Sequence, residues 1–146
     1  MSSRILVLNG PNLNKLGERE PEIYGHESLS DIENLCRLTA QDYDIDIDFR
    51  QSNDEAELIG WIQDLPRYTK GLILNAAAYT HTSVALHDAL KLLDIPVVEV
   101  HLSNPGAREA FRHHSYITPV ATGVISGFGS RSYALAVRAL GEMIKK

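Results

Sequence analysis

With 146 residues, 44% of them hydrophobic and 23% charged, the chain is long enough for one domain around a single core and has the composition of an ordinary globular protein. Its net charge of -5 lacks the basic footprint of a nucleic-acid-binding protein, and no apolar run reaches the roughly 20 residues that a membrane-spanning helix needs. The first residues lack the cleavage pattern of a signal peptide and Cys36 is the only cysteine, so we expect a reducing, cytoplasmic setting and no internal disulfide.

Five apolar strand segments alternate with helical patterns along the chain. In chain order the strands are predicted at Ile5–Leu8, Asp44–Phe49, Leu72–Leu74, Val97–Leu102 and Ala121–Ile125. The helices are predicted at 29–41, 54–64, 83–93, 108–114 and 131–145. Most strands are near-continuous apolar runs, typical of parallel strands covered on both faces, whereas the second alternates strictly, as an edge strand does. This pattern predicts a single α/β domain over residues 1–146, a flavodoxin-like three-layer sandwich whose five-stranded parallel sheet has the order 2-1-3-4-5.

Polar side chains follow three of the predicted strands, at the sheet edge where parallel α/β folds bind their ligands. The first strand runs into Asn9 and Asn12, the third into Asn75 and His81, and the fourth into His101 and Ser103. A single asparagine at a strand end can equally be a turn or capping residue. Because three strand ends carry amide or imidazole groups on one predicted rim, we expect a ligand pocket there.

Glu99 and His101 place a carboxylate and an imidazole in the most hydrophobic strand. Residues two apart on a strand face the same side, so the two side chains can meet. A buried carboxylate needs a partner, and Glu99 can hold one ring nitrogen of His101 and fix its tautomer. The pair is either a satisfied structural contact or a general acid–base unit, and the local residues leave both interpretations open.

A connection of about 20 residues joins the first strand to the first helix, where roughly two to six residues are usual. Its glycines and prolines predict an irregular, mobile lid over about 17–26 beside the ligand edge. The lid carries Arg19 and Tyr24. A guanidinium near a phenol can stabilise the phenolate and lower a pKa that starts near ~10, although such residues are more often plain surface side chains.

Two arginines, Arg108 and Arg112, lie four residues apart on the predicted helix that follows the fourth strand. Such a pair repels unless an anion or an acidic side chain lies between its members. A carboxylate-bearing substrate, or an acid such as Asp88, would fill that role.

Several other site types have weaker support in the sequence. The histidines show no metal-ligand spacing and no H-E-x-x-H is present, so no metal is expected. A flavin-binding module would need a hydroxyl-rich phosphate loop, and the loop NGPNLNKLG is poor in hydroxyls. A phospho-receiver would need acids where Asn9 and Asn75 stand. Besides the flavin-binding module and the phospho-receiver, a third alternative to an enzyme is an assembly subunit that merely shares the fold.

Three long stretches resemble the type II 3-dehydroquinate dehydratases, or type II dehydroquinases. They are ILVLNGPNLNKLGEREPEIYG, NAAAYTHTSVALHDAL and PVVEVHLSNPGAREAFRHHSYITPVATGVISGFGSRSYALA, and the likeness runs nearly end to end. The resemblance implies a flavodoxin-like fold, a homododecamer built from trimers, and no metal or organic cofactor. It also implies the conversion of 3-dehydroquinate to 3-dehydroshikimate by loss of water, in the shikimate pathway of aromatic biosynthesis or in quinate breakdown. The chain departs from the family pattern at Ala76–Ala77, where Pro-Gly is common.

The resemblance also implies a role for individual residues. Tyr24 matches the base, a tyrosinate that takes the proton beside the ketone, and Arg19 matches the lid arginine that stabilises it. Asn12 matches the amide that positions a water against the enolate oxygen. His101 matches the general acid that protonates the departing hydroxyl, and Glu99 its orienting partner. The other matches bind substrate or support the site: Asn75, His81, Leu102, Ser103 and Arg112, with Asp88 reaching the neighbouring subunit's site and Arg108 as a supporting cation near the tyrosine.

Overall fold

The structure, a computed structural model, describes residues 2–18, 20–24 and 26–144, and of Pro21 and Tyr24 only the backbone. The described strands form one parallel sheet of five strands in the order β2-β1-β3-β4-β5, which confirms the predicted order. They are β1 (Arg4–Asn9), β2 (Asp46–Gln51), β3 (Thr69–Asn75), β4 (Val97–His101) and β5 (Gly123–Ser126). The strictly alternating segment is β2, and it lies at the sheet edge as predicted.

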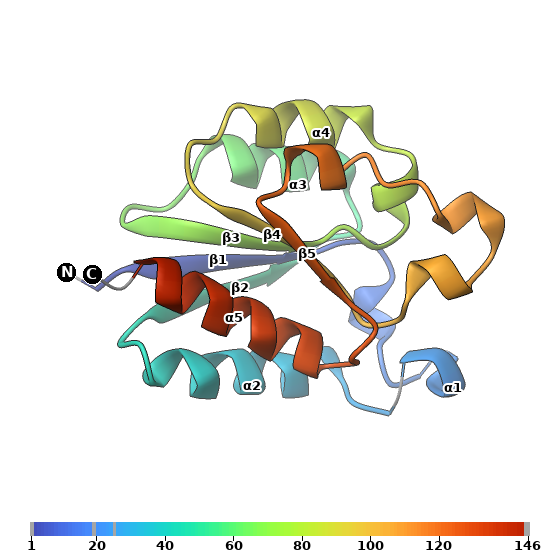
Figure 1. Cartoon of the computed structure of the whole chain (residues 1–146), viewed down its shortest axis with the longest axis horizontal. Helices are drawn as coiled ribbons and strands as arrows, with labels where there is room; N and C mark the ends of the chain where they lie inside the picture. The colour runs from blue at the N-terminus through green and yellow to red at the C-terminus, as the bar shows by residue number, and fades with distance from the viewer. Residues whose placement is uncertain (1, 19, 25, 145–146) are drawn as a thin grey trace.

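Helices cover both faces of the sheet (Figure 1). One face packs against α2 (Leu29–Gln41) and α5 (Arg131–Ile144), and the other against α3 (Glu55–Gln63) and α4 (Val84–Lys91). The alternation along β1 produces this division, because successive strand residues face opposite sides. Ile5 and Val7 belong to the first core and Leu6 and Leu8 to the second, and all four are fully buried.

The predicted helix over 108–114 is wrong. The chain instead makes two 3-10 turns there, Pro105–Ala107 and Ala110–Arg112. The side chain of Asn104 caps the first turn by accepting a hydrogen bond from the Gly106 N–H at 3.1 Å. Arg108 then adopts an extended conformation (φ -108°, ψ -163°), which ends the turn before a helix can propagate. Arg108 and Arg112 therefore do not share one helical face.

The long connection after β1 contains a 3-10 turn, Leu13–Lys15, and a single helical turn, α1 (Pro21–Tyr24). Gly17, at φ +92°, adopts a left-handed conformation that glycine accommodates readily. Figure 1 shows α1 beyond the carboxyl ends of the strands, at the same end of the sheet as the turns that follow β4. Among the described helices, none combines the length and apolarity needed to cross a membrane.

Candidate active site

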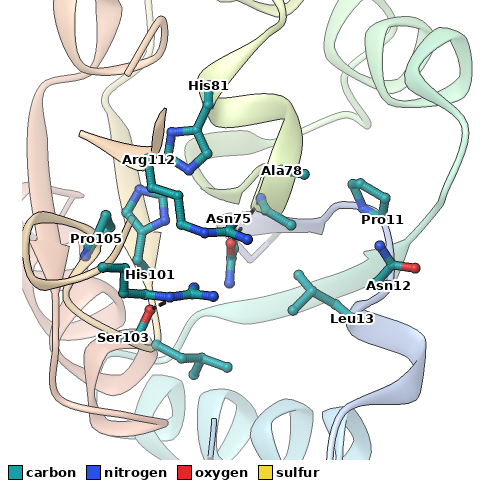
Figure 2. A pocket seen from close by; sticks show the side chains of 13 residues that line it. Pro11, Asn12, Leu13, Asn75, Ala78, His81, His101, Ser103, Pro105 and Arg112 are labelled. Carbon is teal, nitrogen blue, oxygen red and sulfur yellow. Dashed lines mark hydrogen bonds between the residues drawn. The ribbon is translucent and has the colours of Figure 1, made fainter. Parts of the chain in front are cut away.

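A pocket of ≈ 160 Å³ lies at the carboxyl ends of β1, β3 and β4. It brings together eight of the residues singled out from the sequence: Asn12, Asn75, His81, His101, Leu102, Ser103, Arg108 and Arg112. Figure 2 shows His81, His101 and Arg112 on one side of the pocket and Pro11, Asn12 and Leu13 on the other, with Asn75 between them. Segments far apart in the sequence thus meet because parallel strands end at a common edge.

Asn12 and Asn75 lie on this pocket wall because the chain after β1 passes close to the end of β3. The Gly10 N–H donates to the Asn75 carbonyl at 2.8 Å. A side chain at Gly10 would put its Cβ only 2.5 Å from the Ala76 carbonyl oxygen, so this contact requires glycine. Asn12 follows in a left-handed conformation (φ 70°), and its N–H donates to Asn53 Oδ1 at 2.9 Å. The Asn12 amide makes no capping bond to the turn that follows it.

Glu99 and His101 form a buried pair at the end of β4. His101 Nε2 and Glu99 Oε2 are 2.5 Å apart, and the side chains are only 10% and 2% exposed. The Glu99 carboxylate also accepts hydrogen bonds from Ser115 Oγ at 2.9 Å and from Thr118 Oγ1 at 2.6 Å. Burial by itself would raise the pKa of Glu99, but the hydrogen bonds from His101, Thr118 and Ser115 together hold it below its ordinary value.

These contacts assign the two ring nitrogens of His101 different tasks. Because Glu99 is ionised at neutral pH, it accepts, and His101 Nε2 must carry a hydrogen. Nδ1 is then the ring nitrogen left to gain or lose a proton in a reaction. Such an arrangement suits a general acid whose ring is oriented by a carboxylate bonded to the nitrogen that does not transfer a proton.

His81 lies on the same pocket wall, but its other ring nitrogen, Nδ1, carries the hydrogen. Its Nδ1 lies 2.8 Å from the backbone carbonyl of His114, and since a carbonyl can only accept, Nδ1 carries the hydrogen. Burial, followed by the nearby His101 and Arg112, lowers the pKa of His81. A neutral ring protonated on Nδ1 presents Nε2 as a hydrogen-bond acceptor, suited to a ligand hydroxyl.

Two guanidinium groups give the pocket a cationic side. Arg112 Nε lies 2.8 Å from Glu109 Oε1, and Arg108 Nε lies 3.8 Å from the same oxygen. Within this chain the acid between the arginines is Glu109, so an acidic partner is present as expected, but it is a different residue from Asp88. Asp88 instead lies on α4 with its side chain 70% exposed, 3.1 Å from His87 Nδ1. Guanidinium groups at a pocket wall favour a carboxylate-bearing ligand.

Tyr24, the predicted base, and Arg19, its predicted partner, belong to the connection that follows β1. Arg19 lies outside the described residues, and Tyr24 is described only by its backbone, at the end of α1. Glu20 of the same segment contacts a residue of the pocket wall, because its Oε2 lies 3.9 Å from Arg108 Nη2. The segment that carries Tyr24 therefore adjoins the pocket.

Several residues of the site had no signal in the sequence. Ser115 and Thr118 bind Glu99 from 16 and 19 residues further along the chain, so neither helical nor strand periodicity connects them to it. The remaining pocket wall consists of small or apolar residues that resemble ordinary loop positions: Pro11, Leu13, Ala77, Ala78 and Pro105. Among the described residues, no group of three or more His, Cys, Asp or Glu side chains is arranged to hold a metal ion.

Comparison with known proteins gives a consistent result. A sequence profile described as "Dehydroquinase class II" matches residues 3–141. The 3-dehydroquinate dehydratase of Methylobacterium radiotolerans is 56% identical, covering 98% of this chain and 96% of the relative. That of Hyphomonas neptunium is 60% identical, over 95% of this chain and 93% of the relative. The crystal structure of type II dehydroquinase from Propionibacterium acnes has a TM-score of 0.92 and 42% identity, and the match covers 97% of this chain and 98% of that one.

Proposed function

This chain belongs to the class II dehydroquinase family, and we propose that it is a 3-dehydroquinate dehydratase, a hydro-lyase that reversibly converts 3-dehydroquinate to 3-dehydroshikimate. The observation that carries the proposal is the buried Glu99–His101 pair, whose imidazole lies in the wall of a pocket that is also lined by two arginines. An acid–base pair beside cationic groups fits the dehydration of a hydroxylated carboxylic acid. It does not fit the flavin-binding or phospho-receiver alternatives.

The first step of the proposed reaction removes a proton from the carbon beside the substrate's ketone. Such a proton is weakly acidic, so the reaction needs a strong base and stabilisation of the enolate. We assign the base to the phenolate of Tyr24, stabilised by Arg19, and a water held by Asn12 to the enolate oxygen. The contact between Glu20 and Arg108 supports this, because it links a residue of the proposed lid to the pocket wall.

The second step expels the hydroxyl group and forms the carbon–carbon double bond. Hydroxide is a poor leaving group, so a general acid on the opposite face from the base has to protonate it. His101 supplies this proton from Nδ1 while Nε2 remains bonded to Glu99. The elimination is therefore trans: the proton goes to Tyr24, the hydroxyl leaves as water, and Glu99 holds the imidazole in place throughout.

The remaining pocket residues bind the substrate. Arg112 and the backbone N–H groups of Leu102 and Ser103 are assigned to its carboxylate, a planar anion that a guanidinium can bind by two hydrogen bonds. His81 accepts a hydrogen bond from a substrate hydroxyl through Nε2, as its tautomer requires. Asn75 contacts the substrate from the end of β3, and Arg108 adds positive charge near the lid.

The assembly and location of the enzyme also belong to the proposal. We infer a homododecamer that is built from four trimers, in which Asp88 reaches a neighbouring subunit's site. The side chain of Asp88 is exposed, so it is available for such a contact. Residues 17–26 act as the lid over the pocket. The buried, unpaired thiol of Cys36 suits a reducing compartment, so we place the enzyme in the cytoplasm, without a metal or organic cofactor.

A direct assay tests the function. Purified protein is mixed with 3-dehydroquinate, with and without EDTA, and the ultraviolet absorbance of the conjugated enone product is followed. We expect the absorbance to rise at the same rate in both samples. No rise at stoichiometric enzyme would refute the dehydratase function, and loss of the rise with EDTA would refute the metal-free reaction.

A further inference from the structure

A buried hydrogen-bond chain lies behind the pocket and joins α5 to the ends of β1 and β3. Tyr133 is fully buried on α5, and its hydroxyl donates to Asn9 Oδ1 at 2.6 Å. The same hydroxyl accepts a hydrogen bond from Asn75 Nδ2 at 2.9 Å. Burial raises the pKa of Tyr133, so the phenol keeps the proton that it donates. A residue of α5 is thus linked to a side chain of the pocket wall.

The direction of this chain is fixed at both ends by backbone groups. The Arg50 carbonyl can only accept, so the Asn9 atom that faces it, at 2.9 Å, is the NH₂ group. The Asn9 amide oxygen therefore faces Tyr133. Because this oxygen can only accept, the Tyr133 hydroxyl donates its single hydrogen to it. The Tyr133 oxygen can then only accept from Asn75.

The contact of Asn75 with the backbone of Ala77, at the other end of the chain of hydrogen bonds, independently fixes the same orientation of the Asn75 amide. The Ala77 N–H donates to Asn75 Oδ1 at 3.1 Å, which requires an acceptor on that side of the amide. Both ends thus orient Asn75 with its oxygen toward Ala77 and its nitrogen toward Tyr133. Figure 2 shows Asn75 in the pocket wall, so the orientation of its amide is part of the surface that a ligand meets.

We propose that Tyr133 is a positioning residue for substrate binding: its hydroxyl locks the amide of Asn75 in the one orientation that the substrate meets. This inference rests on the proposed function of the pocket. Without the hydroxyl, Asn75 Nδ2 and Asn9 Oδ1 both lose a partner, and only the bond from the Ala77 N–H still orients the Asn75 amide. Since the substrate contacts Asn75 before and during the reaction, loss of this order weakens ground-state and transition-state binding alike.

The test is Tyr133→Phe, which removes the hydroxyl and keeps the ring. We expect the KM for 3-dehydroquinate to rise about tenfold, the cost of one lost hydrogen bond to the ligand, with kcat within about twofold of the wild type. Tyr43→Phe is the matched control, because the Tyr43 ring packs against Gly141 in the last part of α5. It should leave KM unchanged. A lower melting temperature with normal KM in Tyr133→Phe would show a structural role only and overturn the inference.

A double-mutant cycle shows whether Tyr133 acts through Asn75. Asn75→Ala alone should raise KM, and adding Tyr133→Phe should then have no further effect on it. Independent, multiplying effects would overturn the proposed link. Absence of turnover in the wild type would instead refute the dehydratase function, so the two failures are distinguishable.

A measurement on the unmodified protein removes any dependence on the folding of variants. NMR relaxation of the Asn75 side-chain NH₂ group should give an order parameter near that of rigid backbone, about 0.85, without a ligand. A value below about 0.6 would mean that the amide is already mobile and would overturn the inference.

Discussion

Replacing Thr118 by valine removes one of the three side-chain hydrogen bonds that hold the Glu99 carboxylate. Valine has nearly the same shape, so the variant loses the 2.6 Å bond without leaving a cavity. Because Glu99 is buried and ionised, we expect the free energy of unfolding at pH 7 to fall by about 1.5–3 kcal/mol, the range for a hydrogen bond to a charged group. The measurement is urea-induced unfolding followed by circular dichroism.

The pH dependence of this loss distinguishes it from simple packing damage. The folded-state pKa of Glu99 is lowered from its ordinary value of 4.5, so its stabilising contribution is present above that pH and is lost as the pH falls through the folded-state pKa. The Thr118→Val deficit should therefore be largest at neutral pH and shrink as the pH falls through the folded-state pKa, which lies below 4.5. Because Glu99 also orients His101, kcat should fall while KM changes little.

Thr69→Val is the matched control for Thr118→Val. Thr69 Oγ1 donates to the Pro66 carbonyl, also at 2.6 Å, but this acceptor is neutral. We expect this variant to lose about 0.5–1.5 kcal/mol at every pH and to keep its activity. If Thr118→Val loses no more than Thr69→Val, or if its loss stays the same as the pH is lowered until Glu99 is protonated in the folded state, the proposed role of Thr118 in keeping Glu99 ionised is wrong.

Three further predictions concern single residues. Arg112→Lys should raise the KM for 3-dehydroquinate about tenfold with a smaller change in kcat, because lysine cannot make the paired hydrogen bonds of a guanidinium; an unchanged KM would remove Arg112 from the carboxylate site. Ala77→Gly should stabilise the protein by up to about 1 kcal/mol in urea unfolding, because Ala77 has a left-handed φ of 53°, and a destabilised variant would show that this conformation carries no strain. Burial raises the pKa of the Cys36 thiol to about 12, so at pH 8 a thiol reagent should label it only as fast as the protein unfolds, and immediate labelling would contradict its burial.

Much of the fold follows from local patterns. Four apolar runs predict strands because a buried parallel strand has no polar face, and the strict alternation of the second segment predicts the edge position of β2. The failed helix at 108–114 has a local cause: a four-residue spacing of arginines resembles a helical face, but the extended backbone at Arg108 separates two short turns. A charge pattern without a continuous apolar stripe was an insufficient basis for a helix.

The site was predictable where its residues follow strand ends at the common sheet edge or lie two apart on one strand. Glu99 and His101 are two residues apart, so strand geometry alone brings them into contact. Ser115 and Thr118 meet Glu99 only after the chain has turned back toward β4. Tyr133 meets Asn9 across 124 residues, and in the sequence it looks like any buried aromatic residue of an amphipathic helix.

The most direct test of the proposed mechanism separates its two proton transfers. Wild-type protein, Tyr24→Phe and His101→Ala are each incubated with 3-dehydroquinate in deuterated buffer, and dehydration and exchange of the proton beside the ketone are measured together by NMR. The proposed mechanism predicts that Tyr24→Phe loses both reactions, whereas His101→Ala loses dehydration to a much greater extent than exchange. Near-normal dehydration by Tyr24→Phe, or an equal loss of both reactions in His101→Ala, would contradict it.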